Sequence, residues 1–207
     1  MIEYVLPSEI EKRSFEIITE ELEEKNIVLP EKERLITMRA IHTTADFEYA
    51  DTLCYSQDAV DIAKELIRNG ADIVTDTNMA YTGINKSTLA KFGGQAHCFM
   101  ADEDVATEAK KRQVTRATVS MEKAMNIDKP VIFAIGNAPT ALISLHELMG
   151  KTDWRPAFVI GVPVGFVNVE AAKELIMQTD VPYIVNRGRK GGSNVAAAIC
   201  NALLYQI

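Results

Sequence analysis

The stretch 39–49 gathers side chains that could carry out acid-base chemistry. It places His42 between Arg39 and the carboxylates of Asp46 and Glu48, with two threonines next to the histidine. Histidine is the side chain best suited to proton transfer near neutral pH, and only this one of the chain's three has several polar neighbours in sequence. His42 is therefore the candidate catalytic acid or base. The same residues fit a helix C-terminus, where a histidine interacts favourably with the helix dipole, and both interpretations stay open.

The other titratable groups have simpler explanations. His97 falls in an apolar stretch beside Cys98 and His146 in an amphipathic one, so we expect both to be packing or surface residues. Asp46 and Glu48 are two residues apart and would share a strand face or splay on a turn, so we interpret them as orienting partners or loop structure. The chain lacks the Gly-x-Ser-x-Gly motif of α/β-hydrolases, which argues against a hydrolase.

A basic, glycine-rich loop follows the apolar stretch 181–185. It contains Arg187, Arg189 and Lys190, followed by two glycines and a predicted helix start. Glycine permits close backbone approach, and cations near a helix N-terminus suit an anion. The loop lacks the Gly-Lys-Ser/Thr ending of a P-loop, so a carboxylate-rich ligand fits as well as a phosphate. A glycine-rich turn with solvated arginines is the alternative. Arg116, within 103–125, is a second basic candidate.

Composition narrows the class of protein. The chain has 207 residues, 47% of them hydrophobic and 25% charged, which is typical of one α/β domain with a sizeable core. A net charge of −7 with no basic run argues against nucleic-acid binding. Cys54, Cys98 and Cys200 have no metal-ligand or disulfide spacing. We find neither a signal peptide nor an apolar stretch long enough to cross a bilayer, so we expect a cytoplasmic protein with no membrane partner.

Helices are expected first and a sheet afterwards, within one domain spanning 1–207. A Ser8/Glu11 capping box predicts a first helix ending near Asn26, Pro30 opens a second that leads to His42, and Ser56 caps a third that ends at Gly70. These N-terminal helices span about 7–69, and the parallel α/β core spans about 71–207. The predicted strands are 71–75, 95–100, 130–135, 157–160 and 181–185. The predicted helices between them are 86–92, 103–125, 139–149, 169–178 and 193–205.

This alternation predicts a mostly parallel five-stranded sheet covered on both faces by helices. Ligands of such sheets bind beyond the carboxyl ends of the strands. Those ends here carry unusual polar or glycine-rich segments at 76–78, 136–140, 161–165 and 186–193. We therefore expect the site at this edge of the sheet.

The run Arg39-Ala-Ile-His42-Thr-Thr-Ala-Asp46-Phe-Glu48 resembles the signature of the precorrin-8X methylmutases, isomerases of cobalamin biosynthesis. The similarity recurs in order at 76–80, 115–117, 134–142, 161–167 and 187–193. Any one match could be chance, but several in order over nearly the whole chain make the resemblance specific. It implies a flavodoxin-like three-layer α/β/α fold.

The resemblance also implies a reaction. A methyl group would migrate from C-11 to C-12 of precorrin-8X, or of cobalt-precorrin-8, and give hydrogenobyrinate or cobyrinate. Such an intramolecular shift needs neither a redox cofactor nor a bound metal, and His42 would be the proton donor. The family further implies a homodimer with the site near the subunit interface. The implied substrate-binding residues are Ser14, Arg39, Thr43, Thr44, Asp76, Thr77, Met79, Arg116, Asn137, Thr140, Arg187, Gly191, Gly192 and Ser193.

Two other functions remain open from the sequence. A tetrapyrrole- or corrinoid-binding protein without turnover would share the fold and the basic loop, but His42 would be dispensable. A flavodoxin-like nucleotide or phosphate binder would need a phosphate cradle after the first parallel strand, where Asp76 argues against an anion. No residue tells whether the natural substrate contains cobalt.

Overall fold

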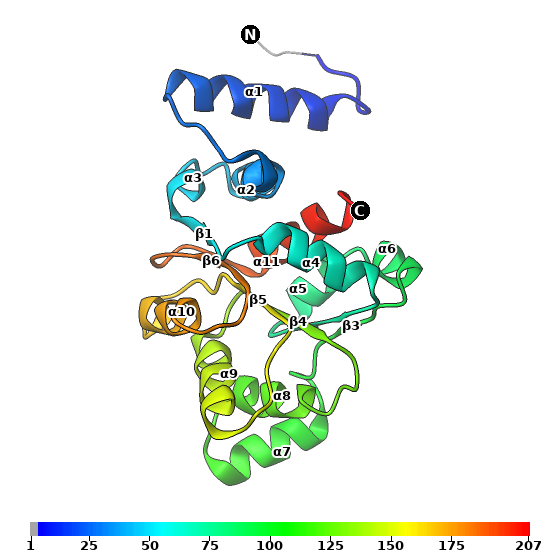
Figure 1. Cartoon of the computed structure of the whole chain (residues 1–207), viewed down its shortest axis with the longest axis vertical. Coiled ribbons are helices and arrows are strands. Elements are labelled where there is room, and N and C mark those ends of the chain that lie inside the picture. Colours follow the sequence, from blue (N-terminus) through cyan, green and yellow to red (C-terminus); the bar gives the residue numbers. More distant parts are fainter. Residues whose placement is uncertain (1–3) are drawn as a thin grey trace.

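A sheet of six strands, in the order β1-β6-β5-β4-β2-β3, runs through the middle of the protein (Figure 1). The computed structural model describes residues 4–207. The strands are β1 Leu53–Tyr55, β2 Asp72–Thr75, β3 Ala96–His97, β4 Val131–Ile135, β5 Phe158–Gly161 and β6 Tyr183–Asn186. Strands β2 to β6 pair in parallel, and β1 pairs antiparallel with β6.

Helices fill most of the remaining chain, and among residues 4–207 none is both long and apolar enough to cross a membrane. The first six are α1 Ile10–Glu24, α2 Glu31–Thr44, α3 Tyr49–Thr52, α4 Ala59–Arg68, α5 Asn78–Gly83 and α6 Lys86–Lys91. They are followed by α7 Glu103–Arg112, α8 Arg116–Ala124, α9 Pro139–Lys151, α10 Val169–Met177 and α11 Ser193–Leu204.

The sheet separates two hydrophobic cores, so the predicted three-layer α/β/α fold is confirmed. Along β4, Ile132 and Ala134 pack with α2, α4 and α11, whereas Phe133 and Ile135 pack with α8, α9 and α10. Successive residues of a strand point to opposite faces, so the continuous apolar run of β4 serves both cores. The order of the five parallel strands, counted from the first, is 2-1-3-4-5, which is the flavodoxin-like order.

The predicted number of five strands was wrong by one. All five predicted strands are present, but β1 adds a sixth at the edge of the sheet, antiparallel to β6. It has only three residues, too few for a periodic pattern to show. It also brings 53–55, from the segment expected to be helical, into the sheet.

Three further expectations were wrong. Ser56 does not cap α4, whose N-cap residue is Asp58; its hydroxyl accepts the backbone N–H of Tyr183 instead. The predicted helix 103–125 is interrupted at Gln113, which has a left-handed conformation with φ of 55°, and α8 starts afresh with Thr115 as its N-cap. Arg116 therefore lies in the first turn of a helix. The Ser8/Glu11 capping box does not form, because α1 begins at Ile10 without a side-chain cap and Glu11 binds Arg39 instead.

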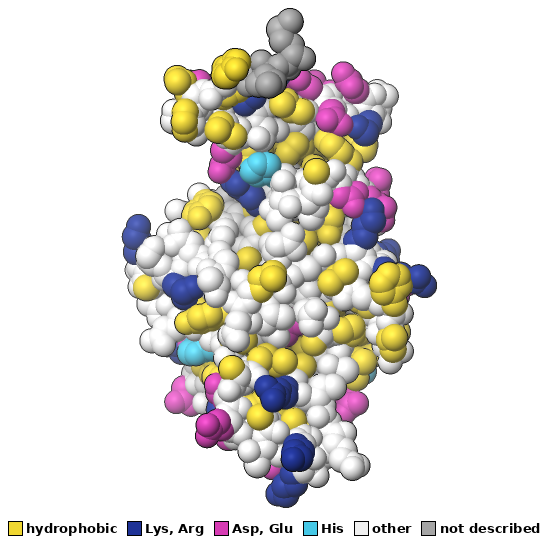
Figure 2. All heavy atoms as spheres, turned by 180° about the vertical axis from the view of Figure 1, so that it is seen from behind, with side chains coloured by type: hydrophobic (Ala, Val, Ile, Leu, Met, Phe, Trp, Pro, Cys, Tyr) yellow, Lys and Arg dark blue, Asp and Glu magenta, His cyan; other side chains and the backbone are white. Residues whose placement is uncertain are grey.

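Helix α1 lies at the outer end of the molecule (Figure 1), where it packs against α2. It buries Ile18 and Leu22 but leaves Ile10 and Ile17 exposed. In the space-filling view this end forms a lobe that carries several exposed apolar side chains (Figure 2).

Candidate active site

Helix α2 presents its functional side chains on one face. Its opposite face is fixed by Ile36, Met38 and Ile41, all buried in the core. Arg39 and His42 are three residues apart, so they lie next to each other on the helix surface. The helix ends one turn beyond them, where Ala45 adopts the left-handed conformation and donates its backbone N–H to the carbonyl of Ile41 at 2.7 Å.

Helix α1 covers this face through Phe15 and Glu11. The ring of Phe15 lies 5.4 Å from the ring of His42 and 4.7 Å from the guanidinium of Arg39. Arg39 donates to the carboxylate of Glu11 at 2.9 Å, and this hydrogen bond lowers the pKa of Glu11. Arg39 and His42 on α2 are thus both contacted by side chains of α1.

Helix α11 supplies the facing wall. Asn194, Ala198, Asn201 and Tyr205 follow one another at helical spacing, so they share one face. With His42 and others they line a cavity of about 480 Å³ between α2, α5 and α11. The full lining is Glu11, Arg39, His42, Thr43, Met79, Gly83, Asn194, Ala197, Ala198, Asn201 and Tyr205.

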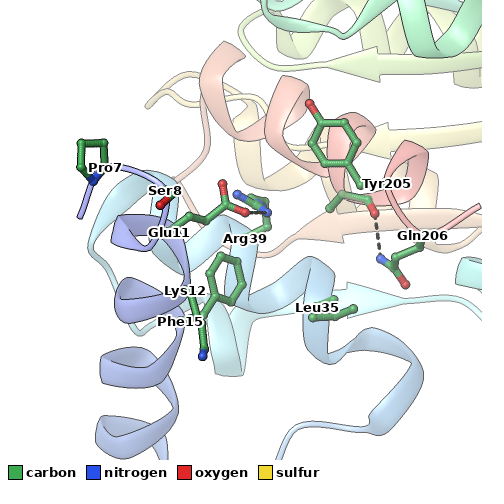
Figure 3. Close-up of a pocket in the computed structure, with 10 residues that line it drawn as sticks. Pro7, Ser8, Glu11, Lys12, Phe15, Leu35, Arg39, Tyr205 and Gln206 are labelled. Atoms are coloured by element: carbon green, nitrogen blue, oxygen red, sulfur yellow. Dashed lines mark hydrogen bonds and ion pairs between the residues drawn. The ribbon is translucent and has the colours of Figure 1, made fainter. Parts of the chain in front are cut away.

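A second cavity, of about 730 Å³, adjoins the first (Figure 3). It lies between α1, α2 and the end of α11, and it shares Glu11, Arg39 and Tyr205 with the His42 cavity. Phe15 and Leu35 give it an apolar floor. The Arg39–Glu11 ion pair therefore belongs to the walls of both cavities, and each volume is in the range of ligand pockets.

Polar residues that follow the carboxyl ends of the strands contact one another. The hydroxyl of Thr77, the N-cap of α5, lies 2.7 Å from that of Ser193 at the start of α11. Thr115 donates to Thr140 at 3.1 Å, beside Arg116. The side chain of Arg116 donates to the carbonyl of Met100 at 3.4 Å, and within residues 4–207 we find no ion pair for it. It is available to an anionic ligand.

Asp76, which we predicted to bind substrate, contacts the backbone of a neighbouring loop. Its side chain is buried, and its two carboxylate oxygens accept the backbone N–H groups of Gly136, Asn137 and Ala138 at 2.5–2.8 Å. This is the switch point between β2 and β4, where flavodoxin-like folds bind their ligand. Asp76 occupies the donors that a phosphate would need, and these hydrogen bonds hold the 136–138 loop against the end of β2.

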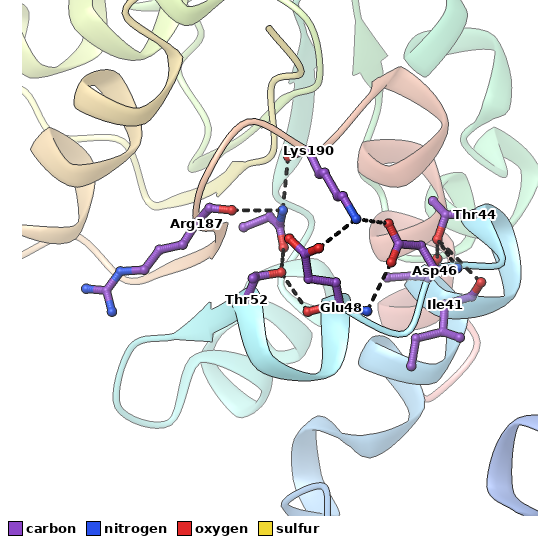
Figure 4. Close-up of polar contacts among 9 residues, drawn as sticks. Ile41, Thr44, Asp46, Glu48, Thr52, Arg187 and Lys190 are labelled. Carbon is purple, nitrogen blue, oxygen red and sulfur yellow. Dashed lines mark hydrogen bonds and ion pairs between the residues drawn. The ribbon is translucent and has the colours of Figure 1, made fainter. Parts of the chain in front are cut away.

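The cations of the 187–190 loop are already paired. Arg187 donates to Glu174 at 3.0 Å and Arg189 to Glu170 at 2.8 Å, both on α10. Lys190 donates to two carboxylates at the end of α2 (Figure 4). In that view the Arg187 side chain points away from Lys190, so the geometry does not bring Arg187 to the His42 cavity.

Glycine is required in this loop at Gly191. A Cβ there would lie 2.1 Å from the carbonyl oxygen of Val162, which no larger residue can tolerate. The next residue, Gly192, donates its N–H to the same oxygen at 2.9 Å. The glycines thus let the loop pack on the end of β5, so that α11 can begin at Ser193.

The remaining predicted residues are more distant or engaged in local contacts. Ser14 donates to the carbonyl of Ile10 within α1, and Thr44 donates to that of Ala40 within α2. Neither lines the two cavities. His97 contacts the buried Asp72 at 2.8 Å, at the start of β2 and opposite the candidate edge. His146 lies on α9, under the other face of the sheet.

Sequence reasoning missed most of the residues that α1 and α11 contribute to the two cavities. Glu11, Phe15, Asn194, Asn201 and Tyr205 line the cavities, but none was a candidate. The two asparagines are seven residues apart on an otherwise apolar helix, and this spacing was a usable signal. The roles of Glu11 and Phe15 depend on how α1 crosses α2, which no local pattern reports.

Comparisons with known proteins agree with one another. The sequence model of the precorrin-8X methylmutase family matches residues 9–206. The cobalt-precorrin-8 methylmutase of Priestia megaterium is 43% identical over 96% of this chain and 88% of its own. The precorrin-8X methylmutase of Pseudomonas aeruginosa is 33% identical over 98% of both chains. The crystal structure of the Thermus thermophilus precorrin-8X methyl mutase superposes with a TM-score of 0.83, at 36% identity, and covers 95% of this chain and 96% of that one.

Proposed function

Because this chain belongs to the precorrin-8X methylmutase family, we propose that it moves a methyl group from C-11 to C-12 of a tetrapyrrole, with His42 as the proton donor. The protein is then an isomerase of cobalamin biosynthesis, and its product is hydrogenobyrinate or cobyrinate. The observation that carries the assignment of His42 is its place in the wall of the 480 Å³ cavity, beside Arg39 and Thr43.

The chemistry requires a proton and a fixed substrate. Protonation of the macrocycle withdraws electrons from its conjugated system and eases the migration. A positioned acid of this kind contributes about 10²–10⁴-fold to a rate. The ring of Phe15 lies 5.4 Å from that of His42, and the opposite face of α2 is buried in the core, so the imidazole lies beside the cavity and against α1.

The substrate carries acidic arms, and the protein is itself net negative. Local donors must therefore hold those arms, because long-range attraction is absent. Arg39, at the boundary of the two cavities, and Arg116, at the edge of the sheet, are the arginines whose positions suit this role. A substrate that extends across both cavities would meet the Arg39–Glu11 pair, and one of its carboxylates would replace Glu11.

We also propose that the substrate contains cobalt. The 43% identical relative is named for cobalt-precorrin-8, and the 33% identical one for precorrin-8X. This difference supports the cobalt-containing substrate. An assay with both substrates, followed by the change in visible absorption, tests the preference and the reaction together.

Binding without turnover is the competing function. His42→Ala separates the two, because it should abolish rearrangement while product binding persists. A chelated and dialysed preparation should keep its full rate, since an intramolecular shift needs no bound metal. Dependence of the rate on an added metal ion or nucleotide would contradict this mechanism.

We also propose a homodimer, formed through the outer face of α1. Ile10 and Ile17 are exposed there and lie seven residues apart on one face of the helix. Sedimentation should give a dimer for the wild type and a monomer for Ile10→Lys/Ile17→Lys. The cytoplasm is the expected location, which cell fractionation would test.

A further inference from the structure

Lys190 connects the glycine-rich loop to the end of the helix that carries His42 (Figure 4). Its ammonium group donates to Asp46 at 2.6 Å and to Glu48 at 2.7 Å. Asp46 is the second residue after the end of α2. The contact therefore joins two segments that are 144 residues apart in sequence, four residues beyond His42.

The acidic turn makes further hydrogen bonds around this contact. The other carboxylate oxygen of Asp46 accepts the backbone N–H of Glu48 at 3.0 Å. The backbone N–H of Asp46 donates to the hydroxyl of Thr44 at 3.3 Å, and that hydroxyl donates to the carbonyl of Ala40 at 2.8 Å. The turn that Lys190 holds is thus bonded back into the last turn of α2, where His42 lies.

The backbone carbonyl of Lys190 accepts a hydrogen bond from a second lysine. Lys173 of α10 is fully buried, and its ammonium group donates to the carbonyls of Gly188 and Lys190 at 2.7 and 2.8 Å. The amide of Asn186 donates to that same carbonyl of Lys190 at 3.0 Å. A buried cation must be compensated by acceptors, and here the loop carbonyls provide them.

From this chain of contacts we infer that Lys190 is a positioning residue for His42, and that its cation is not a substrate-binding group. The inference rests on the proposed function only in naming the reaction that His42 serves. Two carboxylates already surround the ammonium group, and they raise its pKa and lower that of Asp46. A substrate carboxylate would have to displace both.

A positioning role and a binding role predict different kinetics for Lys190→Met. If Lys190 positions His42, the rate at saturating substrate should fall about ten-fold, because small displacements of a catalytic group are costly, while the dissociation constant of the product stays within about two-fold. Lys190→Arg should restore the rate, since arginine can contact both carboxylates. Glu48→Gln should lower the rate in the same direction.

The matched control is Lys151→Met. Lys151 is also an exposed lysine paired with a carboxylate, Glu147 at 2.8 Å, but it lies at the end of α9, remote from α2. This variant should leave rate and binding unchanged. A Lys190→Met enzyme that binds product ten-fold more weakly at an unchanged rate would overturn the inference, as would one in which neither quantity changes.

A measurement without turnover keeps this test separate from the proposed function. The chain has three histidines, so the imidazole signals of His42 in the NMR spectrum can be identified with His42→Ala. These signals should shift in Lys190→Met and stay in place in Lys151→Met, whether or not the protein acts as a methylmutase. Identical His42 signals in the wild type and Lys190→Met would refute the positioning role.

Discussion

The carboxylate of Glu11 lies 2.9 Å from the guanidinium of Arg39, and this contact joins α1 to α2 at the boundary of two cavities. A guanidinium has five N–H donors, and Glu11 occupies only Nη2 of Arg39. A ligand carboxylate that approaches the same edge of the guanidinium therefore competes with Glu11. Glu11 is 65% exposed in its side chain, so it can leave at little cost. The relationship makes Glu11 a competitor of the substrate.

Removal of the two partners should therefore have opposite effects on product binding. Arg39→Ala should weaken it about ten- to a hundred-fold, the value of a charge-assisted hydrogen bond. Glu11→Gln should tighten it by up to about five-fold, since an exposed ion pair worth about 0.2–1 kcal/mol no longer competes. Titration by absorbance measures both. Arg34→Ala is the control, because Arg34 also links α2 to α1, through Thr19, but lines neither cavity.

His42→Ala should abolish methyl migration and leave tetrapyrrole binding largely intact, because the imidazole supplies a proton and not a binding charge. Single-turnover absorbance measurements would show the loss of rate, and a product titration would show the retained affinity. His146→Ala, on α9, should behave like the wild type. Migration at a near wild-type rate without His42 would remove it as the acid.

Arg116 and Arg187 should differ, although the sequence places both among the substrate-binding residues. Arg116 has no carboxylate partner in the part of the chain described here, so Arg116→Ala should weaken product binding about ten- to a hundred-fold. Arg187 is paired with Glu174, points away from Lys190 and lines neither cavity. Arg187→Ala should therefore bind like Arg112→Ala, whose arginine pairs with Glu122. If Arg187→Ala weakens product binding more than Arg116→Ala does, our placement of the substrate-binding site is wrong.

Lys173 should make the stability depend on pH in the alkaline range. Burial lowers its pKa to about 8, against an ordinary value of about 10.4 in the unfolded chain. Between these values the unfolded chain binds more protons, so the free energy of unfolding rises with pH, by at most about 1.4 kcal/mol per unit. Below about pH 8 both states are protonated and this dependence vanishes.

Lys173→Met removes that dependence. The stability of the wild type minus that of the variant should therefore increase from about pH 8 to about pH 10 in urea unfolding experiments. The same difference for Lys151→Met, an exposed lysine, should stay constant. A difference for Lys173→Met that does not change with pH would show that its ammonium group is not destabilised by burial.

Local sequence patterns predicted the parallel sheet because β4 and its neighbours are continuous apolar runs, the form that a strand buried on both faces must take. The break at Gln113 could not be predicted, since glutamine gives no signal for a left-handed residue. His42 and Arg39 were predicted from their types. The pairing of Arg39 with Glu11, and of Lys190 with Asp46, could not be, because both depend on contacts between elements distant in sequence.

The buried carboxylate of Asp76 occupies the switch point of the sheet, the place where related folds bind an external ligand. Three amides that could bind an external anion already donate to this carboxylate, so a phosphate group would have to compete with Asp76 for them. Asp76→Gly would remove the carboxylate and leave the three backbone N–H groups without their acceptor. Added formate or phosphate should then raise the melting temperature of the variant and not that of the wild type. The anion concentration that gives half of this increase would measure the affinity of the three amides for an anion.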